Sequence, residues 1–281
     1  MRVSDYCADC LWKRQQRRSD DRDYLDEIRR IIDSRAENDC APYLVYLFNR
    51  AYERRFGKLS SYGAVKKQYN DLVLSMETEI RRDIEAAPDP LAAAIAYART
   101  GNYIDFGAMN HVDDDTLLSL LEKTALTDRD MPAYRSLAEK CKTAESFLLL
   151  ADNCGEIVLD KLLLEQLGRR FPQLSFTVMV RGAEVLNDVT EEDAVYVGID
   201  KLARIITNGT SVAGTIYDML PVSSKEVFDS ADIIFSKGQG NHESLSGIDR
   251  HIYYALLCKC ELFTERFGVP ELTGIFVESV G

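Results

Sequence analysis

The stretch at residues 147–156, FLLLADNCGE, places five apolar residues directly before a polar turn. Apolar residues at consecutive positions, rather than at alternate ones, are typical of a parallel strand that is buried on both faces. From Glu156 to Arg170 the leucines and isoleucine follow helical spacing. The stretch therefore predicts a strand, a tight turn and a helix, which together form the repeating unit of an α/β sheet.

Further apolar runs of this kind follow along the chain. They cover residues 176–180, 204–206, 232–235 and 252–257, and residues 274–277 are expected to add an edge strand. Helical stretches at residues 191–197 and 223–231 separate several of these runs. Because strands and helices alternate, we expect a doubly wound parallel sheet over residues 146–281.

Residues 1–145 show helical periodicity instead. Helices are expected at residues 21–35, 42–56, 61–86, 90–99, 115–124 and 132–142. The predicted fold class is therefore α/β, with an N-terminal all-helical domain at residues 1–145 and a C-terminal doubly wound α/β sheet domain at residues 146–281.

The composition excludes several classes of protein. The 281 residues carry 34 basic and 46 acidic side chains, a net charge of −12, whereas nucleic-acid binding depends on many basic contacts to phosphate. No apolar run approaches the roughly 20 residues of a membrane helix, and the N-terminus lacks the apolar core of a targeting sequence. Seven scattered cysteines are typical of reduced thiols. We therefore expect a cytoplasmic protein that binds neither nucleic acid nor membrane.

Four of the expected strands run into polar clusters. The clusters are Asp152-Asn153-Cys154-Gly155-Glu156, Arg181-Gly182 followed by Asn187-Asp188, Thr207-Asn208-Gly209-Thr210, and Lys237-Gly238-Gln239-Gly240-Asn241. In an open parallel sheet, ligands bind just beyond the carboxyl ends of the strands. We therefore expect these clusters to meet in one pocket.

Two of the clusters offer ligands for a metal ion. Carboxylate oxygens of Asp152 and Asp188 with the amide oxygen of Asn153 suit Mg²⁺ or Mn²⁺, and three such ligands leave positions open for water and phosphate. The alternative is that Asp152 and Asp188 are helix caps, as aspartate commonly is.

The other polar residues suit a phosphate. Glycines in residues 237–241 let backbone amides approach an anion closely, and Lys237 would neutralise its charge. The alternative is a simple glycine-rich turn. Arg181 could clamp a phosphate or pair with Glu184 or Asp188. Glu156 should begin a helix whose N-terminal amides favour an anion.

Other possible ligands are isolated in the sequence. Cys7 and Cys10 form a single CxxC pair, whereas structural zinc usually takes four ligands, so plain packing and metal or redox use both stay open. His242 lies close to Lys237, and we expect a surface role for it rather than contact with a substrate.

Together these residues resemble the damage-control phosphatase family, metal-dependent enzymes once catalogued as domain of unknown function 89. The resemblance rests on Cys7 with Cys10, on residues 101–107 (GNYIDFG), and on the clusters that begin at Asp152, Arg181 and Lys237. The CxxC pair is similar to that of a stand-alone subgroup found mainly in archaea and bacteria. The family implies a helical domain before an α/β domain, and one divalent metal ion (Mn²⁺, Mg²⁺, Ni²⁺ or Co²⁺) as cofactor.

The resemblance also implies roles for particular residues. The metal ligands would be Asp152, Asn153 and Asp188. The catalytic residues would be Asp152, Asp188 and Lys237. Lys237 would face the phosphate, and the segment with Asn102 and Asp105 would line the cleft, although Asp105 could equally be a helix-end cap. We also expect Glu156, Arg181, Asn187 and Gly238 to bind the substrate or its phosphate. His242 stands where an aromatic residue such as tyrosine is expected.

We therefore expect a metal-dependent phosphatase that acts on small phosphorylated metabolites, either sugar phosphates or damaged nucleotides and cofactor intermediates. The attacking group is water or an aspartate such as Asp152, and the oligomeric state is left open. One alternative is an S-adenosylmethionine-dependent methyltransferase, because a glycine turn after the first strand could hold that cofactor. Another is a protein that binds phosphorylated metabolites without catalysis.

Overall fold

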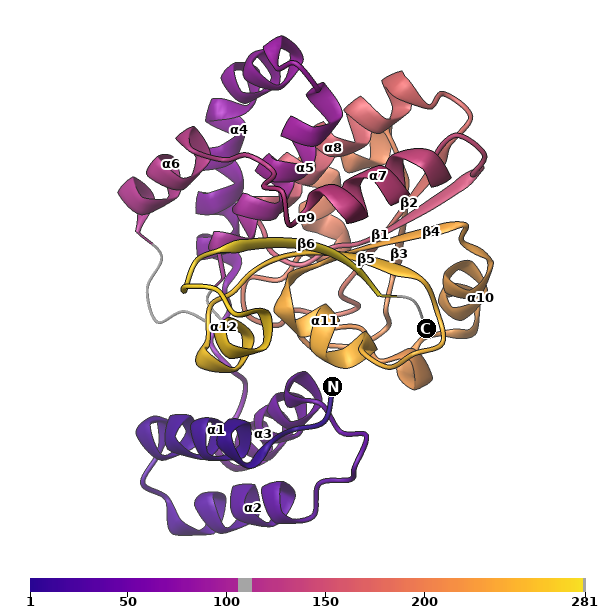
Figure 1. The fold of residues 1–281 in the computed structure, drawn as a ribbon. Helices are drawn as coiled ribbons and strands as arrows, with labels where there is room; N and C mark the ends of the chain where they lie inside the picture. Colours follow the sequence, from indigo (N-terminus) through magenta and orange to yellow (C-terminus); the bar gives the residue numbers. More distant parts are fainter. Residues whose placement is uncertain (106–112, 280–281) are drawn as a thin grey trace.

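The computed structural model describes residues 1–105 and 113–279 (Figure 1). Its centre is a six-stranded sheet with the order β3-β2-β1-β4-β5-β6, in which β6 alone pairs antiparallel. The strands are β1 (Ser146–Leu150), β2 (Ser175–Val180), β3 (Arg204–Thr207), β4 (Ile233–Lys237), β5 (Ile252–Leu257) and β6 (Gly274–Ser279). The α/β fold class with a doubly wound sheet is confirmed.

Helices cover both faces of this sheet. Those that follow β1 in the chain are α8 (Glu156–Arg170), α9 (Glu191–Tyr196), α10 (Val222–Ser230), α11 (Gly238–Leu245) and α12 (Glu261–Phe267). Those that precede it are α1 (Asp5–Arg18), α2 (Arg22–Asp33), α3 (Ala41–Phe56), α4 (Gly63–Ala86), α5 (Pro90–Thr100), α6 (Asp114–Glu122) and α7 (Met131–Lys140). None of these described helices is both long enough and apolar enough to cross a bilayer.

Local sequence signals account for where several helices begin. Asp21, Asp89 and Asp113 are the N-caps of α2, α5 and α6, and each carboxylate accepts a hydrogen bond from a backbone amide in the first turn. Pro90 follows its cap at the first helical position, where the missing N–H group costs nothing. The helix α11 begins at Gly238, where the sequence predicts a glycine-rich loop over residues 237–241.

Successive side chains of β1 enter different cores, because they point to opposite faces of the sheet. Phe147 and Leu149 join the core formed with α4, α5, α7 and α8. Leu148 and Leu150 join the core formed with α10, α11 and α12. Figure 1 shows these two groups of helices on opposite sides of the strands. This double burial explains the uninterrupted apolar run from which β1 was predicted.

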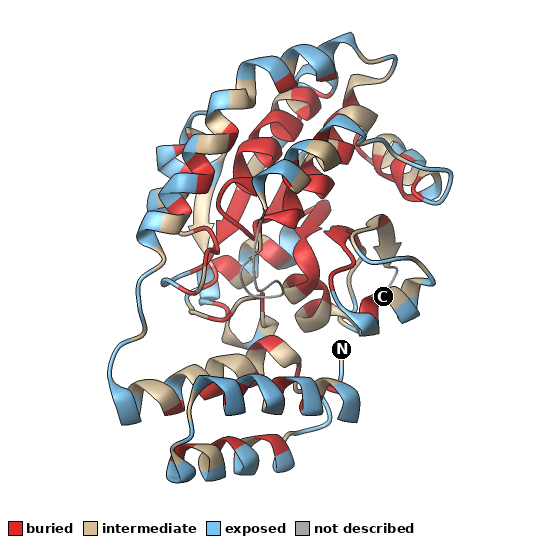
Figure 2. Cartoon of the chain, turned by 90° about the vertical axis from the view of Figure 1, so that its left-hand side faces the viewer, coloured by how far each residue is buried: buried red, intermediate tan, exposed pale blue. Residues whose placement is uncertain are grey.

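The helices of the first half divide between two cores. Side chains of α4, α5 and α7 share one core with the sheet, whereas α1, α2 and α3 form a separate core around Tyr24, Ile28, Leu44 and Phe48. Figure 2 shows this second core as a buried stripe between largely exposed helix surfaces. The domain boundary at residues 145 and 146 stays a prediction, since elements on both sides of it contribute to the same core.

The sheet order places a topological switch point at the carboxyl ends of β1 and β4. These two strands are neighbours, yet the chain runs from β1 to β2 on one side and from β4 to β5 on the other. In open α/β sheets the connections diverge at such a switch point, and ligands bind there. Asp152 follows β1 and Lys237 ends β4, so both lie at this place.

Candidate functional site

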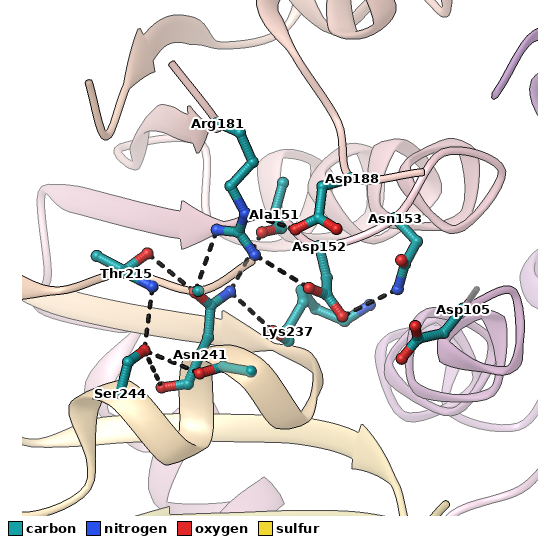
Figure 3. Close-up of polar contacts among 12 residues, drawn as sticks. Asp105, Ala151, Asp152, Asn153, Arg181, Asp188, Thr215, Lys237, Asn241 and Ser244 are labelled. Atoms are coloured by element: carbon teal, nitrogen blue, oxygen red, sulfur yellow. Dashed lines mark hydrogen bonds and ion pairs between the residues drawn. The ribbon is translucent and has the colours of Figure 1, made fainter. Parts of the chain in front are cut away.

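Arg181 brings the two predicted metal-binding carboxylates together. Its Nε atom donates to Asp188 Oδ2 at 2.6 Å and its Nη2 atom donates to Asp152 Oδ1 at 3.0 Å (Figure 3). Only 1% of the Arg181 side chain is exposed. Neither aspartate is a helix cap, because the N-cap of α8 is Gly155 and that of α9 is Thr190. The helix-cap alternative is therefore wrong for both aspartates, and their role as metal ligands stays a prediction.

Two asparagines join Asp152 to Glu156. The Nδ2 atom of Asn153 donates to Asp152 Oδ2 at 2.9 Å and to Glu156 Oε2 at 3.0 Å. The Nδ2 atom of Asn102 reaches the same two oxygens at 3.0 and 3.1 Å. Asn102 is itself held by the backbone amide of Leu257, which donates to its Oδ1 atom. The segment after α5 therefore contacts Asp152 and Glu156 through Asn102.

Lys237 makes contacts that differ from the prediction. Its ammonium group donates to Ala98 O at 2.6 Å, to Glu156 Oε1 at 2.7 Å and to Asp160 Oδ1 at 2.6 Å. An ammonium group has three N–H donors, so these acceptors use all of them, and the side chain is completely buried. The expectation that Lys237 faces a phosphate draws no support from this arrangement.

Lys259 is a cation of the site that the sequence analysis missed. It lies two residues beyond the carboxyl end of β5, and its Nζ atom donates to Asp105 Oδ2 at 2.6 Å. The side chain is buried, and Asp105 is its one recorded acceptor among the described residues. The signal was present in the sequence, because a lysine directly after an apolar run belongs to the same sheet edge as the clusters after β1, β2 and β4.

Gly238 allows the backbone to approach Asp152. Its φ is +76°, and an added Cβ atom would lie 1.8 Å from Asp152 Oδ2. A residue with a side chain could not occupy this place without moving the carboxylate. Gly238 also begins α11, so the amides of the first helical turn start beside the carboxylates rather than in an open loop.

The remaining predicted residues have defined places. Asn187 is buried and its Nδ2 atom donates to Ile104 O at 2.9 Å, which links the loop after β2 to the segment that contains Asp105. Residues 106 and 107 of the quoted GNYIDFG motif lie outside the described residues.

His242 was expected at the surface, and this expectation is wrong: the ring is buried against Tyr254 and Phe263. Cys7 and Cys10 are free thiols.

The cluster holds more carboxylates than cations. Among the described residues, it contains five carboxylates and three cations, which are Asp105, Asp152, Glu156, Asp160 and Asp188 with Arg181, Lys237 and Lys259. Burial raises the pKa of Asp152 well above its ordinary value, and Asp188 and Glu156 raise it further. Burial also raises the pKa of Asp188 to about 6, although Arg181 opposes the shift. A cation beside these carboxylates would favour their charged forms.

The donor set fits a hard metal ion. The predicted ligands offer carboxylate and amide oxygens, which Mg²⁺ and Mn²⁺ prefer over nitrogen and sulfur. Across residues 1–105 and 113–279, no three His, Cys, Asp or Glu side chains are arranged to hold a metal ion. The predicted ligand set is of a different kind, because it combines two aspartates with the amide of an asparagine.

Comparison with known families identifies the family of the chain. Residues 3–273 match the damage-control phosphatase ARMT1-like domain. Because this match covers nearly the whole sequence, the chain belongs to that family, and the resemblance found in the sequence is confirmed.

Individual relatives agree with this placement. The chain is 30% identical to a damage-control phosphatase of Archaeoglobus fulgidus over 96% of both sequences. It is 31% identical to a damage-control phosphatase of Pyrococcus horikoshii over 63% of this chain and 61% of that one. The crystal structure of a DUF89 family protein from Pyrococcus horikoshii superposes with a TM-score of 0.81 at 25% identity, covering 99% of both chains. These relatives support a phosphatase activity for the chain.

Proposed function

We propose that the protein is a metal-dependent phosphomonoesterase of small phosphorylated metabolites, either sugar phosphates or damaged nucleotides and cofactor intermediates. The observation that carries the proposal is the meeting of Asp152 and Asp188 at Arg181, in a buried cluster with more carboxylates than cations. Family membership supports the same activity.

In this proposal Asp152, Asn153 and Asp188 hold one Mn²⁺, Mg²⁺, Ni²⁺ or Co²⁺ ion. Such an ion supplies a Lewis acid that polarises a phosphoryl oxygen. Arg181 holds the two carboxylates in place through separate N–H donors. The amides of Asn102 and Asn153 keep Glu156 next to Asp152, so the negative charge that favours a cation stays concentrated.

Two groups are available to bind the phosphate of the substrate. Lys259 brings a buried ammonium to the edge of the site, with Asp105 orienting it. The first turn of α11 begins at Gly238 beside Asp152, and amides at a helix N-terminus favour anions. Lys237 has a different part in the proposal: it neutralises Glu156 and Asp160 and keeps the acidic cluster folded.

The proposal is tested by phosphate release from p-nitrophenyl phosphate and from a panel of sugar phosphates and nucleotides. We expect release that EDTA abolishes and that Mn²⁺, Co²⁺, Ni²⁺ or Mg²⁺ restores. No release from any compound with any of the four metals would overturn the proposal. Calorimetric titration with S-adenosylmethionine, with no heat expected, tests the methyltransferase alternative.

A further inference from the structure

Asn241 lies at the centre of the contacts drawn in Figure 3. Its Oδ1 atom accepts from Arg181 Nη1 at 3.2 Å and from Thr215 Oγ1 at 2.9 Å. Its Nδ2 atom donates to Ala151 O at 3.2 Å and to Lys237 O at 2.8 Å. An asparagine amide has two donor protons and two acceptor positions, so the side chain, which is fully buried, uses its whole capacity.

Three of these partners, Ala151, Arg181 and Lys237, lie at the carboxyl ends of β1, β2 and β4. Ala151 directly precedes Asp152, and Lys237 is the last residue of β4, so the amide ties together the carboxyl ends of β1 and β4 at the switch point of the sheet. Arg181 follows β2. A single neutral side chain therefore fixes the guanidinium relative to the two strands that flank the switch point.

The neutral acceptor keeps the guanidinium divided between two carboxylates. Arg181 uses Nε for Asp188, Nη2 for Asp152 and Nη1 for Asn241. Without an acceptor at Nη1, the planar guanidinium could turn into a two-point pair with one aspartate, which is the geometry that arginine and carboxylate favour. The other aspartate would then lose its partner, and the separation of the two carboxylates would change.

Thr215 is the second donor to the Asn241 oxygen. Its hydroxyl has a donor proton for Asn241 Oδ1, and its own backbone amide donates to Ser244 Oγ at 3.0 Å. An amide turned by 180° would present its NH₂ group to the Arg181 guanidinium, where two donors face each other. Arg181, which can only donate, and the carbonyls of Ala151 and Lys237, which can only accept, therefore fix the orientation in which the oxygen faces Arg181. The Thr215 hydroxyl holds that oxygen in place as its second donor.

We propose that Asn241 and Thr215 are positioning residues: they hold the Arg181 guanidinium so that Asp152 and Asp188 keep the spacing that a metal ion needs. The inference rests on the proposed phosphatase function. In this proposal neither Asn241 nor Thr215 touches the substrate. Thr215 acts on Asn241, Asn241 acts on Arg181, and Arg181 acts on the two carboxylates.

The test compares Thr215→Val, which keeps the shape and removes the hydroxyl, with Thr215→Ser, which keeps the hydroxyl. Removing a supporting hydrogen bond around metal ligands costs about 10–100-fold in activity or metal affinity. Thr215 lies two contacts beyond Arg181, the direct partner of the carboxylates, so we expect Thr215→Val to lower kcat by about tenfold, the lower end of that range. KM should change less than about threefold, and Thr215→Ser should restore most of the loss. Calorimetric titration with Mn²⁺ alone should show a weakened affinity for Thr215→Val.

A matched control separates positioning from stability. Ser224 has a buried hydroxyl that donates to Thr207 O at 2.7 Å and is not in contact with the cluster. Ser224→Ala should lose a comparable amount of stability, about 1 kcal/mol, and keep wild-type kcat and Mn²⁺ affinity.

A second, milder test variant is Ser244→Ala, which removes the acceptor of the Thr215 backbone amide. We expect it to lower kcat by less than Thr215→Val does.

The outcomes distinguish the two proposals. A wild-type protein that releases no phosphate with any metal overturns the proposed function before any variant is measured. An active wild type together with unchanged kcat and unchanged Mn²⁺ affinity in Thr215→Val overturns the positioning role. If Thr215→Val does not fold, unchanged values in Ser244→Ala overturn it instead.

Discussion

Lys237 Nζ and Asp160 Oδ1 lie 2.6 Å apart in an ion pair that is completely closed to solvent, and Glu156 shares the same ammonium group. Removing one partner of a buried pair leaves a charge without compensation and costs about 3–5 kcal/mol. Lys237→Met leaves two such carboxylates. We therefore expect it to lower the free energy of unfolding by at least this amount, measured by urea denaturation.

Lys67→Met is the matched control for Lys237→Met. Lys67 pairs with Asp71 at the surface, where its side chain is 63% exposed, and such pairs contribute little. Equal losses of stability in the two variants would contradict a special role for the buried pair.

Lys259→Gln tests the phosphate-binding group. A hydrogen bond to a charged group contributes about 1.5–3 kcal/mol, so losing the ammonium should lower kcat/KM for phosphomonoesters by roughly 10–100-fold. Lys58→Gln changes an exposed lysine and should have no effect. An unchanged kcat/KM in Lys259→Gln would remove Lys259 from the site.

Gly238→Ala should abolish activity because its Cβ atom would displace Asp152. The control is Gly247→Ala: Gly247 has a φ of +97°, but no atom lies within 4 Å of its added Cβ. Both variants carry the strain of a positive φ, about 1–2 kcal/mol. Only Gly238→Ala is expected to lose phosphate release, measured with p-nitrophenyl phosphate at saturating Mn²⁺. Loss of activity in both would make backbone strain the cause.

Asp188→Ala removes a proposed metal ligand. We expect it to abolish metal-dependent hydrolysis of p-nitrophenyl phosphate and to weaken Mn²⁺ binding by more than about tenfold, since losing a direct ligand costs more than losing a supporting partner. Asp200→Ala, at an exposed position, is the control for both measurements. A full rate with an unchanged metal requirement in Asp188→Ala would show that the ligand assignment is incorrect.

His242 should make stability depend on pH below neutrality. Burial lowers the pKa of this ring to about 4, with smaller contributions from Arg266 and the N-terminus, whereas the unfolded value is about 6.5. The unfolded state then binds more protons, so stability falls as the pH drops from 6.5 through 4. The expected loss between pH 7.5 and pH 5 is about 2 kcal/mol.

His242→Phe measures this contribution directly. A phenyl ring fits among Tyr254, Phe263 and Phe267, whose rings surround the imidazole, and it does not titrate. Urea denaturation at the two pH values should therefore show a pH dependence smaller by about 2 kcal/mol in the variant. Identical pH dependences would exclude His242 as the titrating group.

The local pattern of apolar residues was sufficient to predict the strands that are buried on both faces. Strands buried on both faces must be apolar at every position, and this is why β1, β4 and β5 could be predicted from the sequence. The rule that ligands gather beyond strand ends placed Asp152 and Asp188 at one site, and Arg181 does contact both. The helices α1, α11 and α12 were not predicted. For α11 the reason is tertiary: Gly240 lies so close to Ala213 O that an added Cβ atom would be 2.2 Å away, so a glycine stands where helix propensity disfavours it.

The sequence by itself determined the order of strands and helices and which polar residues reach the sheet edge, because both depend on neighbours in the chain. Only the tertiary structure decided how those residues pair. Lys237 contacts Ala98, Glu156 and Asp160, which lie 139, 81 and 77 positions away. Lys259 meets Asp105 across 154 positions. Such pairings follow from the packing of helices on the sheet. A sequence motif of a few residues carries no information about that packing.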